Sequence, residues 1–174
     1  MKIFLAVLFI GYGVICKSQV RPLKGEYPNL PYEININKPY DSVWNNLVRF
    51  FTEQGYPIHV QNKTEGLIVS DRFNIKWTYE KKGELKDTTA LIVVPMYHNK
   101  SNNTTIPEPK FNGILSGELN ATLKVNKNSV LVVFNITNIQ KATYNIKDGN
   151  TMYIPYTDYK STGAFEKKLS YYLQ

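Results

Sequence analysis

The sequence predicts an α+β domain of two layers, in which an N-terminal and a C-terminal helix pack on one face of an antiparallel sheet of about six to seven strands. Three observations predict this class. Most segments with strand periodicity follow one another through links of hairpin length, which is typical of antiparallel pairing. Two amphipathic segments with helical periodicity stand at the two ends of the domain. No helix is predicted between successive strands, whereas a doubly wound parallel sheet would need one at each crossover.

The first predicted elements are a strand and a helix. Residues 32–37 alternate apolar and polar side chains, which predicts a half-buried strand. Asp41 or Ser42 is expected to cap the helix that follows, and Gly55 suits the position just after its last turn. Apolar residues in this helix recur at i, i+3, i+4 and i+7, so they form one stripe that can pack onto a sheet. The stripe consists of Trp44, Leu47, Val48 and Phe51.

The middle of the chain is predicted to consist of strands. Residues 57–61 and 67–70 flank a polar, turn-like segment and predict a hairpin, whose second strand is expected to continue to Tyr79. Residues 90–94 form an unbroken apolar run, which predicts a buried strand. Because proline cannot donate to a ladder, Pro95 predicts that this strand ends at a sheet edge or at a bulge.

The second half of the domain alternates polar segments and strands. Residues 98–112 are rich in Asn, Thr, Lys and Pro, which predicts a long mobile loop. Residues 119–125 and 130–136 alternate apolar and polar side chains on either side of a short turn, and they predict the clearest hairpin of the chain. Residues 141–147 are expected to add a strand, and residues 153–159 to form an aromatic connector.

An amphipathic helix is predicted at the end of the chain, with Ser161 or Thr162 as its cap. Residues 32–174 therefore form the predicted α+β domain, a length at which a single hydrophobic core is sufficient. Residues 19–31 contain three prolines and a glycine, and they predict an extended linker ahead of this domain. The apolar stripe of the last helix consists of Phe165, Leu169, Tyr172 and Leu173.

Residues 1–18 predict a secretory signal peptide. Lys2 provides a short positive region, and Ile3–Ile15 is an uncharged run of apolar residues and glycines that is too short to span a bilayer as a helix. Two cleavage chemistries stay open. A type I signal peptidase would leave Gln19 first, and this is the favoured outcome. Cleavage at a lipobox would instead make Cys16 the site of a lipid anchor.

The composition excludes some kinds of catalytic and metal chemistry and argues against one class of partner. Cys16 is the only cysteine, so removal of the leader leaves no disulfide, no cysteine nucleophile and no cysteine-based metal site. The net charge is +7, or +5 without the two lysines of the leader, and the remaining lysines are scattered. Export and the lack of a long basic block argue against nucleic acid as a partner, and no cofactor is predicted.

The sequence holds no recognised catalytic or metal-binding pattern. His59 and His98 are the only histidines, and neither belongs to an H-E-x-x-H or H-x-H pattern. There is no G-x-S-x-G nucleophile elbow, although spacing alone leaves a Ser-His-Asp triad open. We therefore predict no catalytic residue and no metal ligand. The carboxylates that acid–base catalysis would have to pair are isolated in the sequence: Asp71, Glu80, Asp87, Glu118 and Asp158.

Tyrosines gather in the last part of the chain. One hypothesis is an exposed patch that stacks on sugar rings or contacts a protein partner. The favoured hypothesis is that these rings pack half-buried between helix and sheet, where tyrosine is common. The residues are Tyr144, Tyr153, Tyr156, Tyr159, Tyr171 and Tyr172.

Two segments resemble small exported proteins of the Bacteroidetes. The helix from Ser42 to Gly55 and the N-K-T-E-G-L-I run of residues 62–68 resemble the helix and "D-K-x-x-G-L-I" hairpin of periplasmic lipoprotein domains, including BamC-type helix-grip modules. Residues 161–166, S-T-G-A-F-E, resemble the "S-T-G-K-L-E" opening of the last helix in such proteins. Asn62 replaces the usual Asp. The resemblance implies a helix-grip, or TBP-like, fold in the periplasm or cell envelope of a Gram-negative bacterium.

The sequence thus favours an exported domain that acts by binding rather than by catalysis. A protein or glycan of the cell envelope is the expected partner, and the membrane only if Cys16 is acylated. The alternative is a carrier of a small apolar ligand, which a closed cavity beneath the Trp44 helix would favour. A hydrolase comes third, and it would need a cleft that joins a histidine to a carboxylate and a hydroxyl. A solid core with an exposed aromatic patch would favour the binding domain.

Overall fold

The computed structural model describes residues 19–99, 103–107, 113–145 and 149–174. The predicted signal peptide, with Cys16, lies outside the described residues. So do parts of the predicted loop over residues 98–112 and the end of the predicted strand over residues 141–147.

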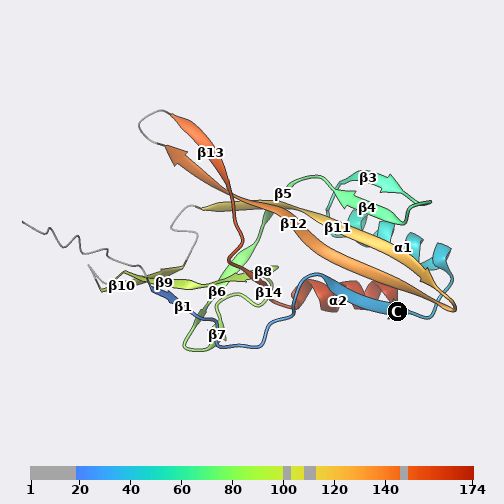
Figure 1. Ribbon diagram of the computed structural model, residues 1–174, viewed down its shortest axis with the longest axis horizontal. Helices are drawn as coiled ribbons and strands as arrows, with labels where there is room; N and C mark the ends of the chain where they lie inside the picture. The colour runs from blue at the N-terminus through green and yellow to red at the C-terminus, as the bar shows by residue number, and fades with distance from the viewer. Residues whose placement is uncertain (1–18, 100–102, 108–112, 146–148) are drawn as a thin grey trace, which may run out of the picture.

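A long antiparallel hairpin runs through the structure and forms its spine (Figure 1). Its strands are β11 (Ile114–Asn126) and β12 (Ser129–Asn145), and Lys127 in the turn has a φ of 46°. The predicted hairpin of residues 119–125 and 130–136 is therefore confirmed, and it extends well beyond those residues at its open end.

The main sheet has seven strands and is built around this spine. One edge of β12 pairs with β2 (Tyr32–Ile36) near the turn and with β13 (Asn150–Pro155) near the open end. One edge of β11 pairs in the same way with β4 (Leu67–Ser70) and then β5 (Phe73–Ile75). The sheet ends at β3 (Ile58–Asn62), which forms the predicted hairpin with β4. All these pairs are antiparallel.

Seven shorter strands form two further sheets at the open end of the spine. Pro95 lies where the chain passes from the four-stranded sheet into the three-stranded one. The three-stranded sheet consists of β1 (Gln19–Arg21), β9 (Met96–Asn99) and β10 (Thr104–Pro107). The four-stranded sheet consists of β14 (Lys160–Ser161), β8 (Ile92–Val94), β6 (Trp77–Lys81) and β7 (Glu84–Leu85).

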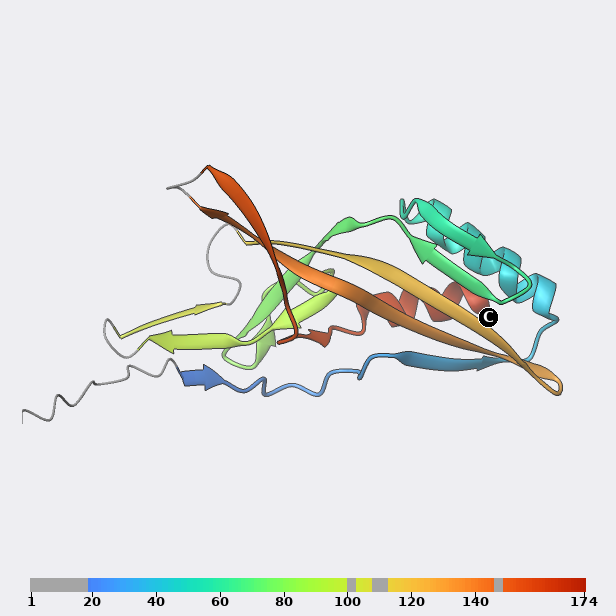
Figure 2. The same cartoon turned by 45° about the horizontal axis from the view of Figure 1, so that its top comes forward.

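Both helices lie on one face of the main sheet and contact each other (Figure 2). They are α1 (Tyr40–Glu53) and α2 (Ala164–Leu173). The rings of Phe134 on β12 and Phe165 on α2 are stacked with centroids 4.2 Å apart, and Phe50 of α1 meets Phe165 edge-on at 4.9 Å. All three rings are buried. An α+β fold with a large antiparallel sheet and two helices is thus confirmed.

The helices begin differently from the prediction. No side chain caps α1: Pro39 takes the N-cap position, so neither Asp41 nor Ser42 has that role. At α2 the N-cap is Gly163 with a φ of 82°, and the hydroxyl of Thr162 accepts a hydrogen bond from Ala164 N at 3.3 Å. The apolar stripes of both helices are directed into the core as predicted, because burial depends on side-chain spacing rather than on the cap.

Two segments predicted to lack strands contain them. Instead of one long loop, β9 and β10 form an antiparallel pair that spans most of residues 96–107. Instead of a plain connector, residues 150–155 form β13. In β13 every residue is exposed, so it lacks the alternation of buried and exposed residues from which a strand can be predicted.

The strand that begins at β4 does not continue unbroken to Tyr79. The chain pairs with β11 again as β5 and then crosses into the four-stranded sheet as β6. Phe73, Ile75 and Trp77 keep their alternation because both short strands turn one face to the core, so the pattern could not reveal the change of sheet. There β6 runs parallel to β8, so purely antiparallel pairing is wrong for this pair.

The segment predicted as a linker, residues 19–31, runs along the domain in contact with it. β1 pairs with β9, and the Glu80 carboxylate accepts hydrogen bonds from Lys24 N and Gly25 N at 2.7 Å and from the Tyr27 hydroxyl at 2.6 Å. Burial acts to raise the pKa of Glu80, but these hydrogen bonds outweigh it, so the pKa lies below its usual value. The anionic carboxylate therefore ties this segment to β6.

We expect Gly66→Ala to lower the free energy of unfolding by about 3 kcal/mol or more. A Cβ atom there would lie 2.4 Å from the carbonyl oxygen of Leu123, at a φ of +67°. Gly55 has a φ of +74° with no atom within 4 Å, so Gly55→Ala should cost only about 1 kcal/mol of backbone strain. Urea unfolding of both variants measures the difference, and equal losses would contradict a role for the close contact.

Candidate functional site

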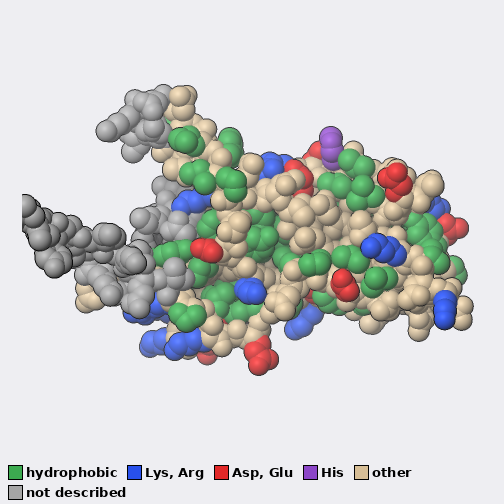
Figure 3. All heavy atoms as spheres, viewed as in Figure 1, with side chains coloured by type: hydrophobic (Ala, Val, Ile, Leu, Met, Phe, Trp, Pro, Cys, Tyr) green, Lys and Arg blue, Asp and Glu red, His purple; other side chains and the backbone are tan. Residues whose placement is uncertain are grey.

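The open end of the spine projects from the body as a two-stranded arm (Figure 1). We define the arm as residues 140–145 of β12 and 150–155 of β13, which pair throughout. Every residue of β13 is exposed. The space-filling view shows this end standing clear of the main mass of the molecule (Figure 3).

The arm exposes large apolar side chains on both of its faces. Tyr144, Met152, Tyr153 and Ile154 have between 47% and 63% of their surface exposed. Because directly paired residues share a face, Tyr153 and Tyr144 lie on one side of the ribbon, and Met152 and Ile154 lie on the other. β13 itself contains no charged residue. Large apolar side chains gathered on the surface in this way are a common feature of protein interaction sites.

The outer edge of β13 also offers backbone hydrogen-bonding groups. β13 ends its sheet, so no described strand pairs with this edge. Tyr156 N donates a hydrogen bond to Ile139 O at 2.9 Å, and backbone groups along an antiparallel strand alternate in direction. The N–H and C=O groups of Ile154 and Met152 are therefore directed at β12. Those of Thr151 and Tyr153 are directed outward. Pro155, with no N–H to donate, takes an outward position as well, as expected at an edge.

A β-bulge lies at the base of the arm. Gly117 of β11 lies opposite two residues of β12, Asn138 and Ile139, and Asn138 has a φ of 52°. A Cβ on residue 117 would lie 2.8 Å from Ile75 Cδ1 and 3.0 Å from the carbonyl oxygen of Thr137, so glycine is required by packing. Bulges bend a strand and increase its twist, so this one sets the direction in which the arm leaves the body.

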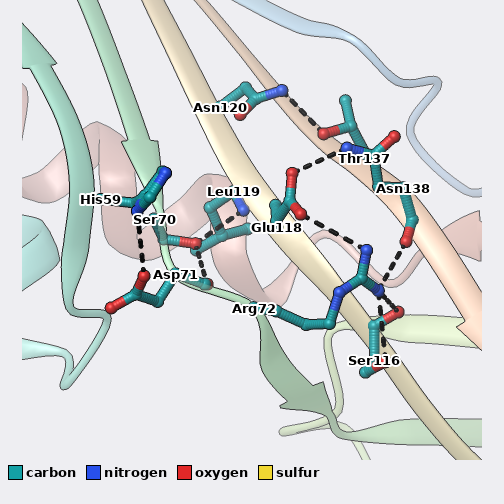
Figure 4. A network of polar contacts seen from close by, with 10 residues as sticks. All are labelled: His59, Ser70, Asp71, Arg72, Ser116, Glu118, Leu119, Asn120, Thr137 and Asn138. Carbon is teal, nitrogen blue, oxygen red and sulfur yellow. Dashed lines mark hydrogen bonds and ion pairs between the residues drawn. The ribbon is translucent and has the colours of Figure 1, made fainter.

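One arginine holds both strands at the bulge (Figure 4). Arg72 Nη1 donates to the carbonyl oxygen of Asn138 at 2.9 Å and, at 3.4 and 3.3 Å, to the carbonyl oxygen and hydroxyl of Ser116. Its Nη2 pairs with Glu118 Oε1 at 3.3 Å, and Glu118 Oε2 accepts from Asn138 Nδ2 at 2.7 Å. The planar guanidinium thereby holds four acceptor atoms, on three residues, around the bend.

His59 approaches a carboxylate and a hydroxyl without forming a triad. His59 Nδ1 lies 3.4 Å from Asp71 Oδ1, and their side chains are 70% and 55% exposed (Figure 4). The neighbouring Ser70 hydroxyl is buried, donates to the Asp71 carbonyl and accepts from Leu119 N. Its proton and its acceptor capacity are thus engaged with the backbone, so it is poorly placed as a nucleophile. His98, the other histidine, lies in β9.

The predicted carboxylates are distributed over the molecule rather than paired. Each has its own partner: Asp71 has His59, Glu80 has Tyr27, Asp87 has Lys76, Glu118 has Arg72 and Asp158 has Tyr97. Among the described residues, no group of three or more His, Cys, Asp and Glu side chains is gathered as a metal would require. None of the described helices has the length and apolar composition needed to cross a bilayer.

The predicted tyrosine cluster separates into three places. Tyr144 and Tyr153 are exposed on the arm, and Tyr171 is 82% exposed on α2. Tyr156 and Tyr159 line a pocket of about 420 Å³ beside the base of the arm. Tyr172 meets Phe50 edge-on at 5.1 Å. The second hypothesis, half-buried packing, is therefore confirmed for Tyr156, Tyr159 and Tyr172, whereas Tyr144, Tyr153 and Tyr171 are exposed, as the first hypothesis requires. Sequence reasoning missed the arm, although uncharged residues 150–155 ending in proline were a usable signal.

Comparison with known proteins places the chain in no family: no family model matches it, and neither does any curated protein. Its function is therefore inferred from the arm, the bulge and the surfaces described above.

Replacing Arg72 with lysine should destabilise the protein by about 1–2 kcal/mol, because a single ammonium cannot reach all four acceptor atoms around the bend. Arg49 is the matched control, since its exposed ion pair with Glu53 at 3.7 Å and its cation–π contact with Tyr172 at 5.7 Å can both be made by a lysine. Arg49→Lys should change stability by less than about 0.5 kcal/mol. The measurement is the urea midpoint at neutral pH, and equal shifts for the two variants would argue against the role given to Arg72.

Proposed function

We propose that this protein is an exported, non-enzymatic binding domain of the bacterial cell envelope, and that the arm binds a partner protein. One observation carries the proposal: β13 ends the main sheet with all six residues exposed, uncharged and rich in large apolar side chains. Such an edge is a ready template for another strand.

The partner that fits this edge is an extended segment of a protein. Thr151 and Tyr153 would exchange backbone hydrogen bonds with it, and this main-chain ladder would supply the affinity. Met152 and Ile154 on one face and Tyr153 on the other would contact its alternate side chains and supply the specificity. A glycan lacks the regularly spaced N–H and C=O groups of a strand, so it fits this edge less well.

The solid core supports a binding domain over a carrier with a cavity beneath α1. Trp44 is 3% exposed, and Leu47, Phe50 and Phe51 are fully buried beneath this helix. The fold is proposed to be of the helix-grip type, as the resemblance of residues 42–70 implies, because both helices lie on one face of the antiparallel sheet. Export is proposed from residues 1–18.

Photo-cross-linking tests the arm as the binding surface. A benzophenone amino acid at position 153 should form adducts with an envelope protein, whereas the same group at position 171, also an exposed tyrosine, should not. Thr151→Pro removes an outward N–H and should abolish the adducts of position 153. Thr151→Val keeps that N–H and should preserve them.

Two results would contradict the proposal. Adducts of equal yield at positions 153 and 171 would show that the arm has no special role. Adducts that survive Thr151→Pro would show that backbone pairing at β13 is not the mode of binding. A variant that fails to bind is informative only if its urea midpoint matches that of Thr151→Val, which establishes that the fold is retained.

Export predicts a particular mature chain. Intact mass of the protein from its own host should match a chain that begins at Gln19, as type I cleavage would leave it. A mass that includes an acylated Cys16 would instead show a lipid anchor. An uncleaved chain in the cytosol would contradict the proposal of export.

A further inference from the structure

A second hollow lies away from the arm, between the two helices. This cleft has a volume of about 360 Å³ and is bordered by the end of α1, by β5, by residues 88–91 and by the start of α2. None of its lining residues belongs to the arm.

The inner surface of the cleft is aromatic. It is lined by Phe50, Tyr56, Phe73 and Phe165, of which Phe50 and Phe165 are buried and the other two are half-buried. The rings brace one another: Tyr56 lies 4.9 Å from Phe73 and 6.0 Å from Phe165, measured between centroids. Rings held by such contacts form a preorganised apolar wall.

Two lysines line the cleft, and they differ in their partners. Lys76 Nζ lies 2.8 Å from Asp87 Oδ2 and 2.5 Å from Thr89 Oγ1. The hydrogen bond from Lys76 and those that Thr89 donates from its hydroxyl and its N–H lower the pKa of Asp87 to about 2, so the charge of Lys76 is balanced. Lys168 Nζ donates to the neutral amide oxygen of Gln54 at 2.7 Å. Within the described part of the chain, Lys168 is the cation of this cleft that has no carboxylate partner.

We propose that this cleft binds a small aromatic monocarboxylate, with its rings against Tyr56 and Phe73, which the buried Phe50 and Phe165 support, and its carboxylate at Lys168. One uncompensated cation beside an apolar wall is complementary to one anion on an apolar body. The volume is at the lower end of the range for small-ligand sites, which limits the ligand to about one or two rings. This site goes beyond the proposed function, because it needs neither the arm nor its partner.

Paired fluorescent probes test the site. Anilinonaphthalene sulfonate carries one anionic group, and phenylnaphthylamine has the same rings without it. The anionic probe should bind saturably at one site per chain. Lys168→Gln should weaken its binding about tenfold and change binding of the neutral probe less than about twofold. The adjacent Lys167→Gln, outside the cleft, should leave both unchanged.

Two further variants make the outcome decisive. Ala164→Phe, which fills the cleft from the start of α2, should abolish binding of both probes, and naphthoate should displace the anionic probe from the unmodified protein. The double variant Met152→Lys with Ile154→Lys disrupts the apolar arm and should leave both probes bound. The proposal is overturned if that double variant removes the binding, if Lys168→Gln behaves like Lys167→Gln, or if naphthoate does not compete.

Discussion

The aromatic contact between β12 and the helices is the constraint on which the rest of the structure depends. Phe134 and Phe165 stack at 4.2 Å, and Phe50 closes on Phe165 from α1, so three elements far apart in sequence share one buried cluster. Because both helices pack against this part of the spine, neither can cover its open end. The exposure of the arm follows from where the rings meet.

The difference in length between β12 and the helices explains why the arm projects from the body. β12 has 17 residues and spans roughly 56 Å at about 3.3 Å per residue. α1 has 14 residues and spans only about 21 Å at about 1.5 Å per residue. Neither α1 nor α2, which has 10 residues, can therefore shield the whole strand. The bulge at Asn138, fastened by Arg72, bends the spine where the helical cover ends, and the strand beyond it is directed into solvent.

The sequence predicted helices and strands correctly where one face of the element is buried. It did not predict them where no face is buried. The alternation of residues 119–125 and 130–136 and the stripe of α1 report burial, so those elements could be predicted. β13 buries no residue and has no alternation to detect. The Arg72 network joins residues that lie 44 and 66 positions apart, so no local sequence pattern predicts it. The helix starts depend on the backbones of Pro39 and Gly163, so no capping side chain predicts them either.

Two of the other outer strands of the main sheet, β2 and β3, show what a protected edge looks like in this protein. β3 exposes His59 and Gln61, and β2 exposes Glu33, all of them polar side chains that discourage pairing with another chain. β13 has no charge and retains outward N–H groups, with Pro155 as its one protective residue. Exposed apolar edges invite aggregation. The apolar edge of β13 contrasts with the polar edges of β2 and β3, and the proposed partner strand would account for this difference.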